Sequence, residues 1–186
     1  LVEVGVGVMP GWGGCKEMIR RHLGNKRAPR GPMPALVKAF ELIGTAQVAK
    51  SAMEAQRDFL IINEDDTITF NKERVLFDAK QRALGMVEGY QPPEEETFRL
   101  PGATGRAAID MALHDFNMKG MASDYDVHVG REVAMVLTGG DTDVTEELTE
   151  RDLLKLEQKH FVALTKQPKT LARLEHMLST NKPLRN

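Results

Sequence analysis

The stretch Leu1-Val-Glu-Val-Gly-Val-Gly-Val-Met-Pro-Gly-Trp-Gly-Gly14 carries most of the information about the fold. A valine stands at every second position of residues 2–8, and this period of two predicts a strand or extended segment. Pro10-Gly11 predicts a turn, and Gly13-Gly14 permits backbone dihedrals that other residues avoid. Apolar residues then recur at helical spacing over residues 15–23. The sequence therefore predicts a strand, a glycine-rich turn and a helix.

Three common motifs with this layout do not fit the residues. A dinucleotide-binding fingerprint needs glycine at its sixth position, where this chain has Pro10. A phosphate-binding P-loop needs Gly-Lys followed by Ser or Thr, but Cys15 separates Gly14 from Lys16. A nucleophile elbow needs serine between its glycines, and Trp12 stands there. One interpretation of the turn is purely structural: it lets a helix pack on a strand.

A family resemblance offers a second interpretation. The segment from Glu3 to Met18, Glu-Val-Gly-Val-Gly-Val-Met-Pro-Gly-Trp-Gly-Gly-Cys-Lys-Glu-Met, resembles the second catalytic segment of the crotonase (enoyl-CoA hydratase/isomerase) family. In that pattern a Glu and several apolar residues precede Gly-x-x-Pro-Gly-x-Gly-Gly-Thr and a helix. The resemblance places Glu3 at the position of one of two catalytic glutamates, and Cys15 replaces the usual Thr. It assigns substrate binding to the turn residues Pro10, Gly11, Gly13 and Gly14.

The resemblance extends over nearly the whole chain. Residues 36–44 and 48–60 also resemble the crotonase family. The stretch from Leu156 to the end is similar to the crotonase-like C-terminal part of one bacterial group of multifunctional 3-hydroxyacyl-CoA dehydrogenases. The resemblance implies a role in fatty-acid β-oxidation, with acyl-CoA as the partner and water addition to a 2-enoyl-CoA as the reaction. It also implies NAD as the cofactor of a separate dehydrogenase domain, with no cofactor in this chain.

Several parts of a crotonase site would have to lie outside this sequence. The two backbone N–H groups of the oxyanion hole, and the other catalytic glutamate, come from segments upstream of the position of Glu3 in that family. We therefore expect a C-terminal fragment that needs the upstream half of its own chain and is inactive alone. Its exposed apolar seams should favour a homo-oligomer. The alternative is a non-catalytic helical interaction or oligomerisation module, in which Glu3 is an ordinary surface residue.

Composition limits the binding partners and the cellular compartment that we expect. The chain has 186 residues and a net charge of −2, so no general attraction to nucleic acid or to an anionic membrane is expected. A single cysteine fits a reducing, cytoplasmic compartment. No apolar run approaches the roughly 18 residues that a membrane span needs. The five histidines show no metal-ligand spacing, so we expect no metal site.

The remaining sequence predicts a mainly α fold with a small β component, namely the N-terminal strand and one hairpin. The domain boundaries that we expect are a remnant of a crotonase core at 1–88, a Pro- and Glu-rich linker at 89–102, and a helical C-terminal subdomain at 103–186. The hairpin is expected at residues 59–62 and 67–70. Further helices are expected at 35–43, 52–57, 72–87, 104–119 and 124–137. Another is expected to open at Thr149 with Leu164 still in register, and the last from Pro168 onward.

Overall fold

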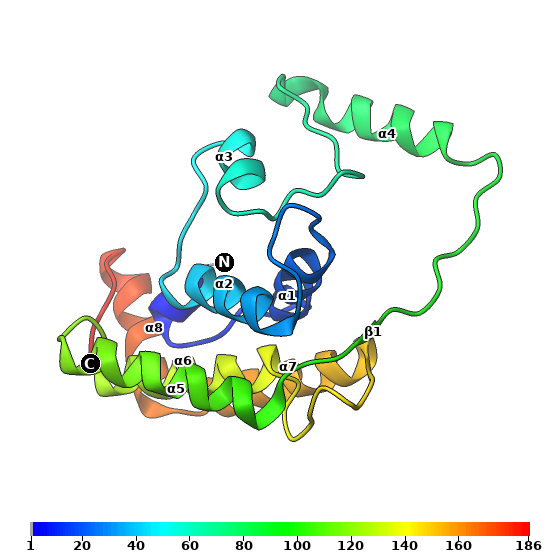
Figure 1. Ribbon diagram of the computed structural model, residues 1–186. Coiled ribbons are helices and arrows are strands. Elements are labelled where there is room, and N and C mark those ends of the chain that lie inside the picture. Colours follow the sequence, from blue (N-terminus) through cyan, green and yellow to red (C-terminus); the bar gives the residue numbers. More distant parts are fainter. Residues whose placement is uncertain (1) are drawn as a thin grey trace.

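The computed structural model describes residues 2–186 and is mainly helical, with one small antiparallel sheet (Figure 1). The α-helices are α1 (Gly14–Gly24), α2 (Pro32–Gly44), α3 (Ala52–Arg57), α4 (Val75–Gly85), α5 (Gly102–Met118), α6 (Asp124–Leu137), α7 (Glu150–Thr165) and α8 (Pro168–Thr180). The shorter elements are the 3-10 helices η1 (Glu3–Val6) and η2 (Lys72–Arg74) and the strands β1 (Thr97–Phe98) and β2 (Leu148–Thr149).

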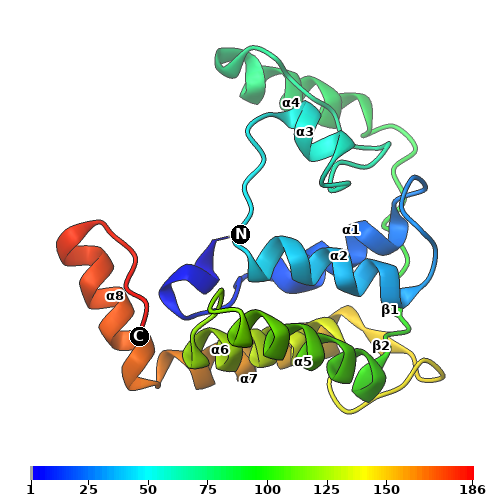
Figure 2. The ribbon, with the colours of Figure 1, turned by 60° about the vertical axis from the view of Figure 1, so that its left-hand side comes forward.

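Helix α6 lies at the centre of the core. It packs against α1, α2, α5 and α7 and also contacts η1 (Figure 2). Gly130 allows the close approach of α5, because a Cβ there would stand 2.6 Å from a methyl carbon of Leu113. The core thus joins helices from both ends of the sequence. Its fully buried side chains include Ile19, Leu36, Ile43, Val133, Leu137, Leu153 and Leu164.

The two strands attach the end of the Pro- and Glu-rich stretch to the core. Thr97 pairs with Thr149 and Phe98 with Leu148 in antiparallel register. The Phe98 side chain is buried, and so is that of Leu100. The chain therefore reaches the core before α5 begins.

Most predicted helix boundaries are confirmed. The side chains of Ser51 and Asn71 accept backbone N–H groups at the starts of α3 and η2. Ser123 and Thr149 form capping boxes at the starts of α6 and α7, and Pro168 begins α8. These signals are local, since each depends on residues within one helical turn.

The predicted strand at residues 2–8 is wrong. The chain forms η1 there, and hydrogen bonds run from Gly5 N–H to Val2 O (3.0 Å) and from Gly7 N–H to Val4 O (3.1 Å). A strand needs a neighbour to satisfy its backbone groups. In residues 2–186 only β1 and β2 pair, and neither lies beside this segment, so its backbone bonds are made locally.

The predicted hairpin at residues 59–62 and 67–70 is also wrong, because no strand forms there. Side chains take up the carbonyl groups that a hairpin ladder would have used. His22 Nε2 lies within hydrogen-bond distance of Phe59 O (3.0 Å), Asn25 donates to Leu60 O (2.8 Å), and Arg21 donates to the next carbonyl, at residue 61 (2.7 Å). This segment is therefore held against the end of α1 instead of pairing with itself.

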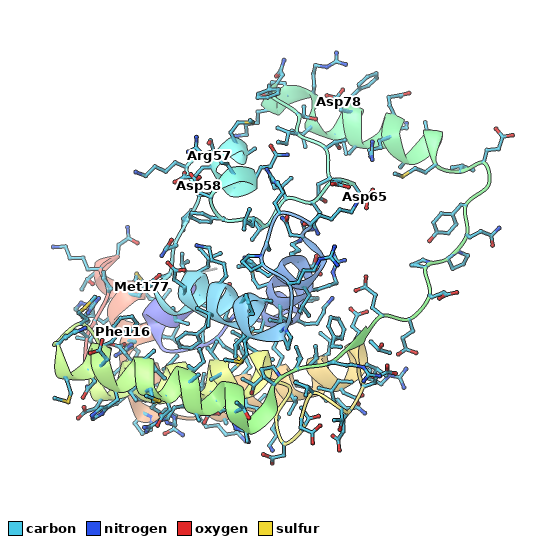
Figure 3. The ribbon with its side chains drawn as sticks, viewed as in Figure 1. Arg57, Asp58, Asp65, Asp78, Phe116 and Met177 are labelled. Atoms are coloured by element: carbon cyan, nitrogen blue, oxygen red, sulfur yellow. The ribbon has the colours of Figure 1, made fainter. Side chains whose placement is uncertain are left out.

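Helix α4 extends away from the core, and none of its residues is buried (Figures 1 and 3). An extended segment leads from it back to β1 (Figure 1). Across residues 2–186 no helix combines the length and the apolarity that crossing a membrane would require.

Candidate functional site

Glu3 lies in the first turn of η1, where its main chain is fixed and its carboxylate is partly enclosed. The carbonyl of Glu3 accepts the N–H of Val8 at 3.3 Å. One side-chain oxygen, Oε2, is buried and has no hydrogen-bond partner among the described residues. A buried carboxylate oxygen without a donor is costly and therefore uncommon. Within residues 2–186 this oxygen therefore keeps an unused acceptor position.

Residues 7–14, here called the Gly turn, connect η1 to α1. Gly7 has a φ of 84°, and its carbonyl accepts a hydrogen bond from the Thr170 hydroxyl of α8 at 2.7 Å. A Cβ at Gly7 would stand 2.9 Å from that hydroxyl oxygen, so only glycine fits. Gly13, with a φ of 78°, precedes the first residue of α1. Trp12 lies between these glycines with a φ of 57°, and its side chain is fully exposed.

A carboxylate from α7 occupies the N-terminus of α1. Glu157 is 4% exposed, and its two oxygens accept the N–H groups of Gly13 (2.5 Å) and Cys15 (2.9 Å). The unpaired N–H groups and the dipole at the start of a helix favour a negative charge at this position. Glu157 therefore fixes the Gly turn to α7 across 144 residues of sequence.

The thiol of Cys15 lies in the same cluster. It is fully buried, and Sγ is 3.7 Å from the carbonyl oxygen of Pro10. Burial raises the pKa of this thiol well above its usual value, and the charges of Glu157 and Glu3 raise it further. Both carboxylates are thus close enough to Cys15 to act on it electrostatically.

Helix α8 fixes the other side of the Gly turn. The Tyr125 hydroxyl hydrogen-bonds with the Thr170 hydroxyl at 2.6 Å. Arg173, almost fully buried, pairs with Asp126 at 2.7 Å, and its guanidinium lies over the Tyr125 ring. Burial raises the pKa of Asp126, but hydrogen bonds from Ser123 and Arg173 outweigh it and keep the pKa below its ordinary value. These contacts tie α6 and α8 to the turn.

The site residues that the sequence indicates lie in one continuous segment, with Glu3 at its start. Pro10 is buried within it, and Gly13 adjoins the helix terminus. Sequence reasoning missed Glu157 and Thr170. Glu157 did carry a signal, because it stands on the apolar face of α7, four residues after the buried Leu153. Thr170 carried none.

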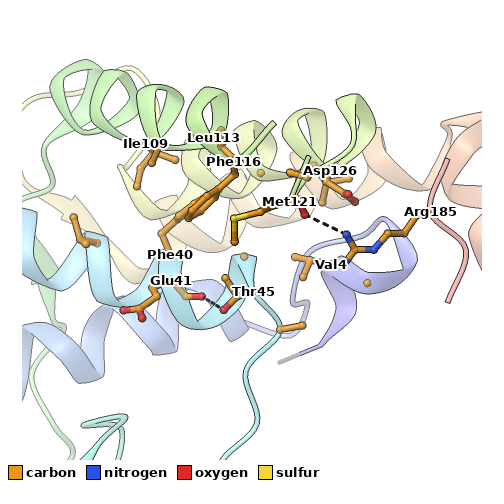
Figure 4. Close-up of a pocket in the computed structure, with 18 of the residues that line it drawn as sticks. Val4, Phe40, Glu41, Thr45, Ile109, Leu113, Phe116, Met121, Asp126 and Arg185 are labelled. Carbon is orange, nitrogen blue, oxygen red and sulfur yellow. Dashed lines mark hydrogen bonds between the residues drawn. The ribbon is translucent and has the colours of Figure 1, made fainter. Parts of the chain in front are cut away.

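A cavity of about 570 Å³, here called the α2–α5 cavity, adjoins this segment (Figure 4). Helices α2, α5 and α6 form most of its walls, and Val4 and Gly5 add the residues directly after Glu3. Glu3 itself does not line it. Its polar side chains are Glu41, Thr45, Asp126, Arg173 and Arg185.

No group of three or more His, Cys, Asp or Glu side chains gathers as a metal site within residues 2–186. His160 pairs through Nδ1 with Glu132 at 2.6 Å, which joins α7 to α6. These histidine and carboxylate contacts are structural links between helices.

The chain is similar to bacterial proteins named as a 3-hydroxyacyl-CoA dehydrogenase or as fatty acid oxidation enzymes. It is 40% identical over 187 residues to the "Probable 3-hydroxyacyl-CoA dehydrogenase" of Bacillus subtilis (strain 168), an alignment that covers all of this chain and 23% of that protein. It is 26% identical over 175 residues to the "Putative fatty acid oxidation complex trifunctional enzyme" of Rickettsia prowazekii (strain Madrid E), covering 94% of this chain and 21% of that protein.

A Rickettsia felis protein of the same name is 27% identical over 176 residues, with the same coverage. The chain thus spans between a fifth and a quarter of the length of these relatives. No family model matches the sequence, and no solved structure matches the chain.

Proposed function

We propose that this chain is the hydratase-like portion of a fatty-acid β-oxidation enzyme that acts on acyl-CoA thioesters. The observation that carries the proposal is Glu3, whose buried Oε2 has no hydrogen-bond partner within residues 2–186 and whose main chain is fixed beside the Gly turn. Similarity to a protein named as a 3-hydroxyacyl-CoA dehydrogenase, over the whole chain, and to one named for fatty acid oxidation, over 94% of it, supports the substrate class. The resemblance of residues 3–18 to a crotonase catalytic segment supports the reaction type.

In the proposed reaction, the oxygen of water bonds to C3 of a 2-enoyl thioester and a proton is added to C2. Glu3 would accept a hydrogen bond from that water and carry its proton, in the manner of a general base. The role is consistent with a partly enclosed carboxylate whose buried oxygen Oε2 has no hydrogen-bond donor within residues 2–186. We propose that the turn residues Pro10, Gly11, Gly13 and Gly14 shape the substrate side of this site.

The oxyanion hole of the proposed enzyme has to come from other residues. Two N–H groups at the start of α1, those of Gly13 and Cys15, already donate to Glu157. They are not free to stabilise a thioester oxygen. We therefore propose that a partner segment of the same polypeptide supplies those donors and the second carboxylate. The 186-residue chain alone should not hydrate crotonyl-CoA.

NAD belongs to the proposed dehydrogenase activity of the whole enzyme, and residues 2–186 do not fit it. The dinucleotide site needs a strand, a Gly-x-Gly-x-x-Gly turn and a helix. Here η1 replaces the strand, and Pro10 occupies the sixth motif position counted from Gly5.

The test is hydration of crotonyl-CoA by the full-length protein that carries this chain. Glu3→Gln keeps the shape of the side chain but removes the base, so kcat should fall by about 100-fold or more while KM changes little. Glu64→Gln is the matched control, because Glu64 is an exposed carboxylate paired only with Lys26, and it should leave the rate unchanged. Wild-type kcat in the Glu3→Gln variant would show that the proposal is wrong.

A second candidate function is a helical module for self-association. Helix α4 has no buried residue, and apolar side chains on it and beside it are exposed, Phe70 by 86% and Leu76 by 82%. Apolar side chains gathered in this way often mark contact sites between proteins. We propose that α4 joins copies of this chain, a role that is compatible with the enzymatic one.

A further inference from the structure

The α2–α5 cavity has the size and lining of a ligand site. Its volume of about 570 Å³ lies within the range of roughly 300–1,000 Å³ that small-molecule pockets occupy. Protein interiors are close-packed, so an apolar space of this size beside the core is large enough for a small ligand. The large apolar side chains that line it are Phe40, Ile109, Leu113, Phe116, Met121 and Val129.

Five residues of α5 form one wall of the cavity. They are Ala108, Ile109, Ala112, Leu113 and Phe116, which recur at helical spacing on one face. This stretch covers about 12 Å at 1.5 Å per residue. An extended covalent chain advances about 1.2 Å per bond, so the wall matches a straight chain of roughly ten atoms. The two alanines leave room along it.

Asp126 and its partner Arg173 lie at the end of the cavity near Arg185, whereas Glu41 lies on α2 beside Phe40 (Figure 4). Arg173 pairs with Asp126 at 2.7 Å, and Glu41 pairs with Lys38 at 3.3 Å. Arg185 donates one hydrogen bond, to the carbonyl of Met121 at 3.1 Å, and within residues 2–186 it makes no ion pair. Figure 4 shows Arg185 beside Met121 and Val4, with Ile109 and Leu113 at the opposite end.

We propose that the α2–α5 cavity binds a straight-chain fatty carboxylate of about ten carbons. The hydrocarbon chain lies along α5, and the carboxylate meets the guanidinium of Arg185. Arginine suits this task because its planar donors can bind both oxygens of a carboxylate. The proposal goes beyond the function proposed above, because it requires no turnover and involves neither Glu3 nor the Gly turn.

The test is calorimetric titration of the 186-residue chain with decanoate, decanol and butyrate. Decanoate should bind once per chain, and the other two at least about tenfold more weakly, because butyrate lacks most of the buried methylenes and decanol lacks the charge. Arg185→Ala should lower the affinity for decanoate to that for decanol and leave the affinity for decanol unchanged. Equal affinities for decanoate and decanol would overturn the assignment of Arg185.

Filling the cavity gives an independent readout. Ala112→Leu should lower decanoate affinity by about tenfold or more, because the larger side chain takes up the space of several methylenes. Ala103→Leu is the matched control on the same helix at an exposed position and should bind as wild type. Circular dichroism establishes that each variant folds, and Ala108→Leu replaces Ala112→Leu if that variant does not.

Three results would overturn the proposal. One is the absence of decanoate binding, and a second is wild-type affinity in the folded cavity-filling variant. The third is tighter binding of decanoyl-CoA with the same dependence on Ala112, which would make a thioester the ligand instead of the free acid. All three are independent of the Glu3→Gln assay, so failure here leaves the hydratase proposal standing.

Discussion

At the scale of single residues, the buried cluster around Cys15 makes that thiol unreactive. Burial and the neighbouring carboxylates raise its pKa, and only the thiolate is strongly nucleophilic. We expect the thiol of the folded protein to react with a disulfide reagent such as DTNB at least about 100-fold more slowly than in urea. Absorbance of the released thiolate measures this. Equal rates in the two conditions would mean that the cluster is open to solvent.

Glu17 predicts a pH dependence of stability. Hydrogen bonds and charge from Arg20, and then Arg21, lower its pKa from 4.5 to about 2. Because the folded-state pKa is the lower one, this contribution to stability is present above pH 4.5 and is lost as the pH falls toward 2.

In urea unfolding at pH 2 to 5, Glu17→Gln should therefore show a shallower fall in unfolding free energy than wild type. Glu94→Gln serves as control, since Glu94 is exposed in the segment before β1, and it should follow wild type. The same slope in the Glu17 variant as in wild type would contradict the assignment.

At the scale of elements, Glu157 is the main polar link between α7 and α1. Replacing it with alanine leaves the N–H groups of Gly13 and Cys15 buried without an acceptor. Glu157→Ala should lower the unfolding free energy by about 3 kcal/mol, as expected for two hydrogen bonds to a charged group. Gln158→Ala changes the adjacent exposed residue and should stay within about 0.5 kcal/mol of wild type. Urea denaturation measures the unfolding free energy of both variants. An equal loss of unfolding free energy in the two would show that Glu157 does not link α7 to α1.

The elements that the sequence predicted correctly are those with local signals. Ser123 and Thr149 begin helices because their side chains cap the following turn, and Pro168 begins α8 because its φ suits a first helical position. The strand at residues 2–8 failed for the opposite reason: alternation favours a strand only where a partner strand exists. Similarly, the hairpin at 59–70 lost its carbonyl groups to donors from α1 and the residues after it.

The candidate site divides in the same way. Glu3 and the glycines of the turn could be found from sequence, because the motif is contiguous. Glu157 and Thr170 could not be placed there, because they reach the turn from α7 and α8 through the tertiary fold. The α2–α5 cavity could not be predicted from sequence either, since it arises where three helices leave a space between small residues such as Ala112 and Gly44.

At the scale of the whole molecule, the arm formed by α4 predicts self-association. The net charge of −2 gives little repulsion between copies, and the exposed Leu76 and Phe77 offer an apolar contact. We expect light scattering to show a dimer or larger species for wild type and a monomer for the double variant Leu76→Glu, Phe77→Glu. Gln81→Glu adds charge on the same helix and should keep the wild-type state. A monomeric wild type would exclude this role.

The anchoring of the Gly turn also determines when it can form. Its bonds to Glu157 and Thr170 span 144 and 163 residues, the most distant kind of contact that a chain of this length can make. Such loops close late in folding, and synthesis proceeds from the N-terminal end. The segment around Glu3 therefore leaves the ribosome long before its anchors do. Until α7 and α8 have emerged, this segment of valines and glycines lacks its tertiary contacts and is accessible to chaperones and proteases.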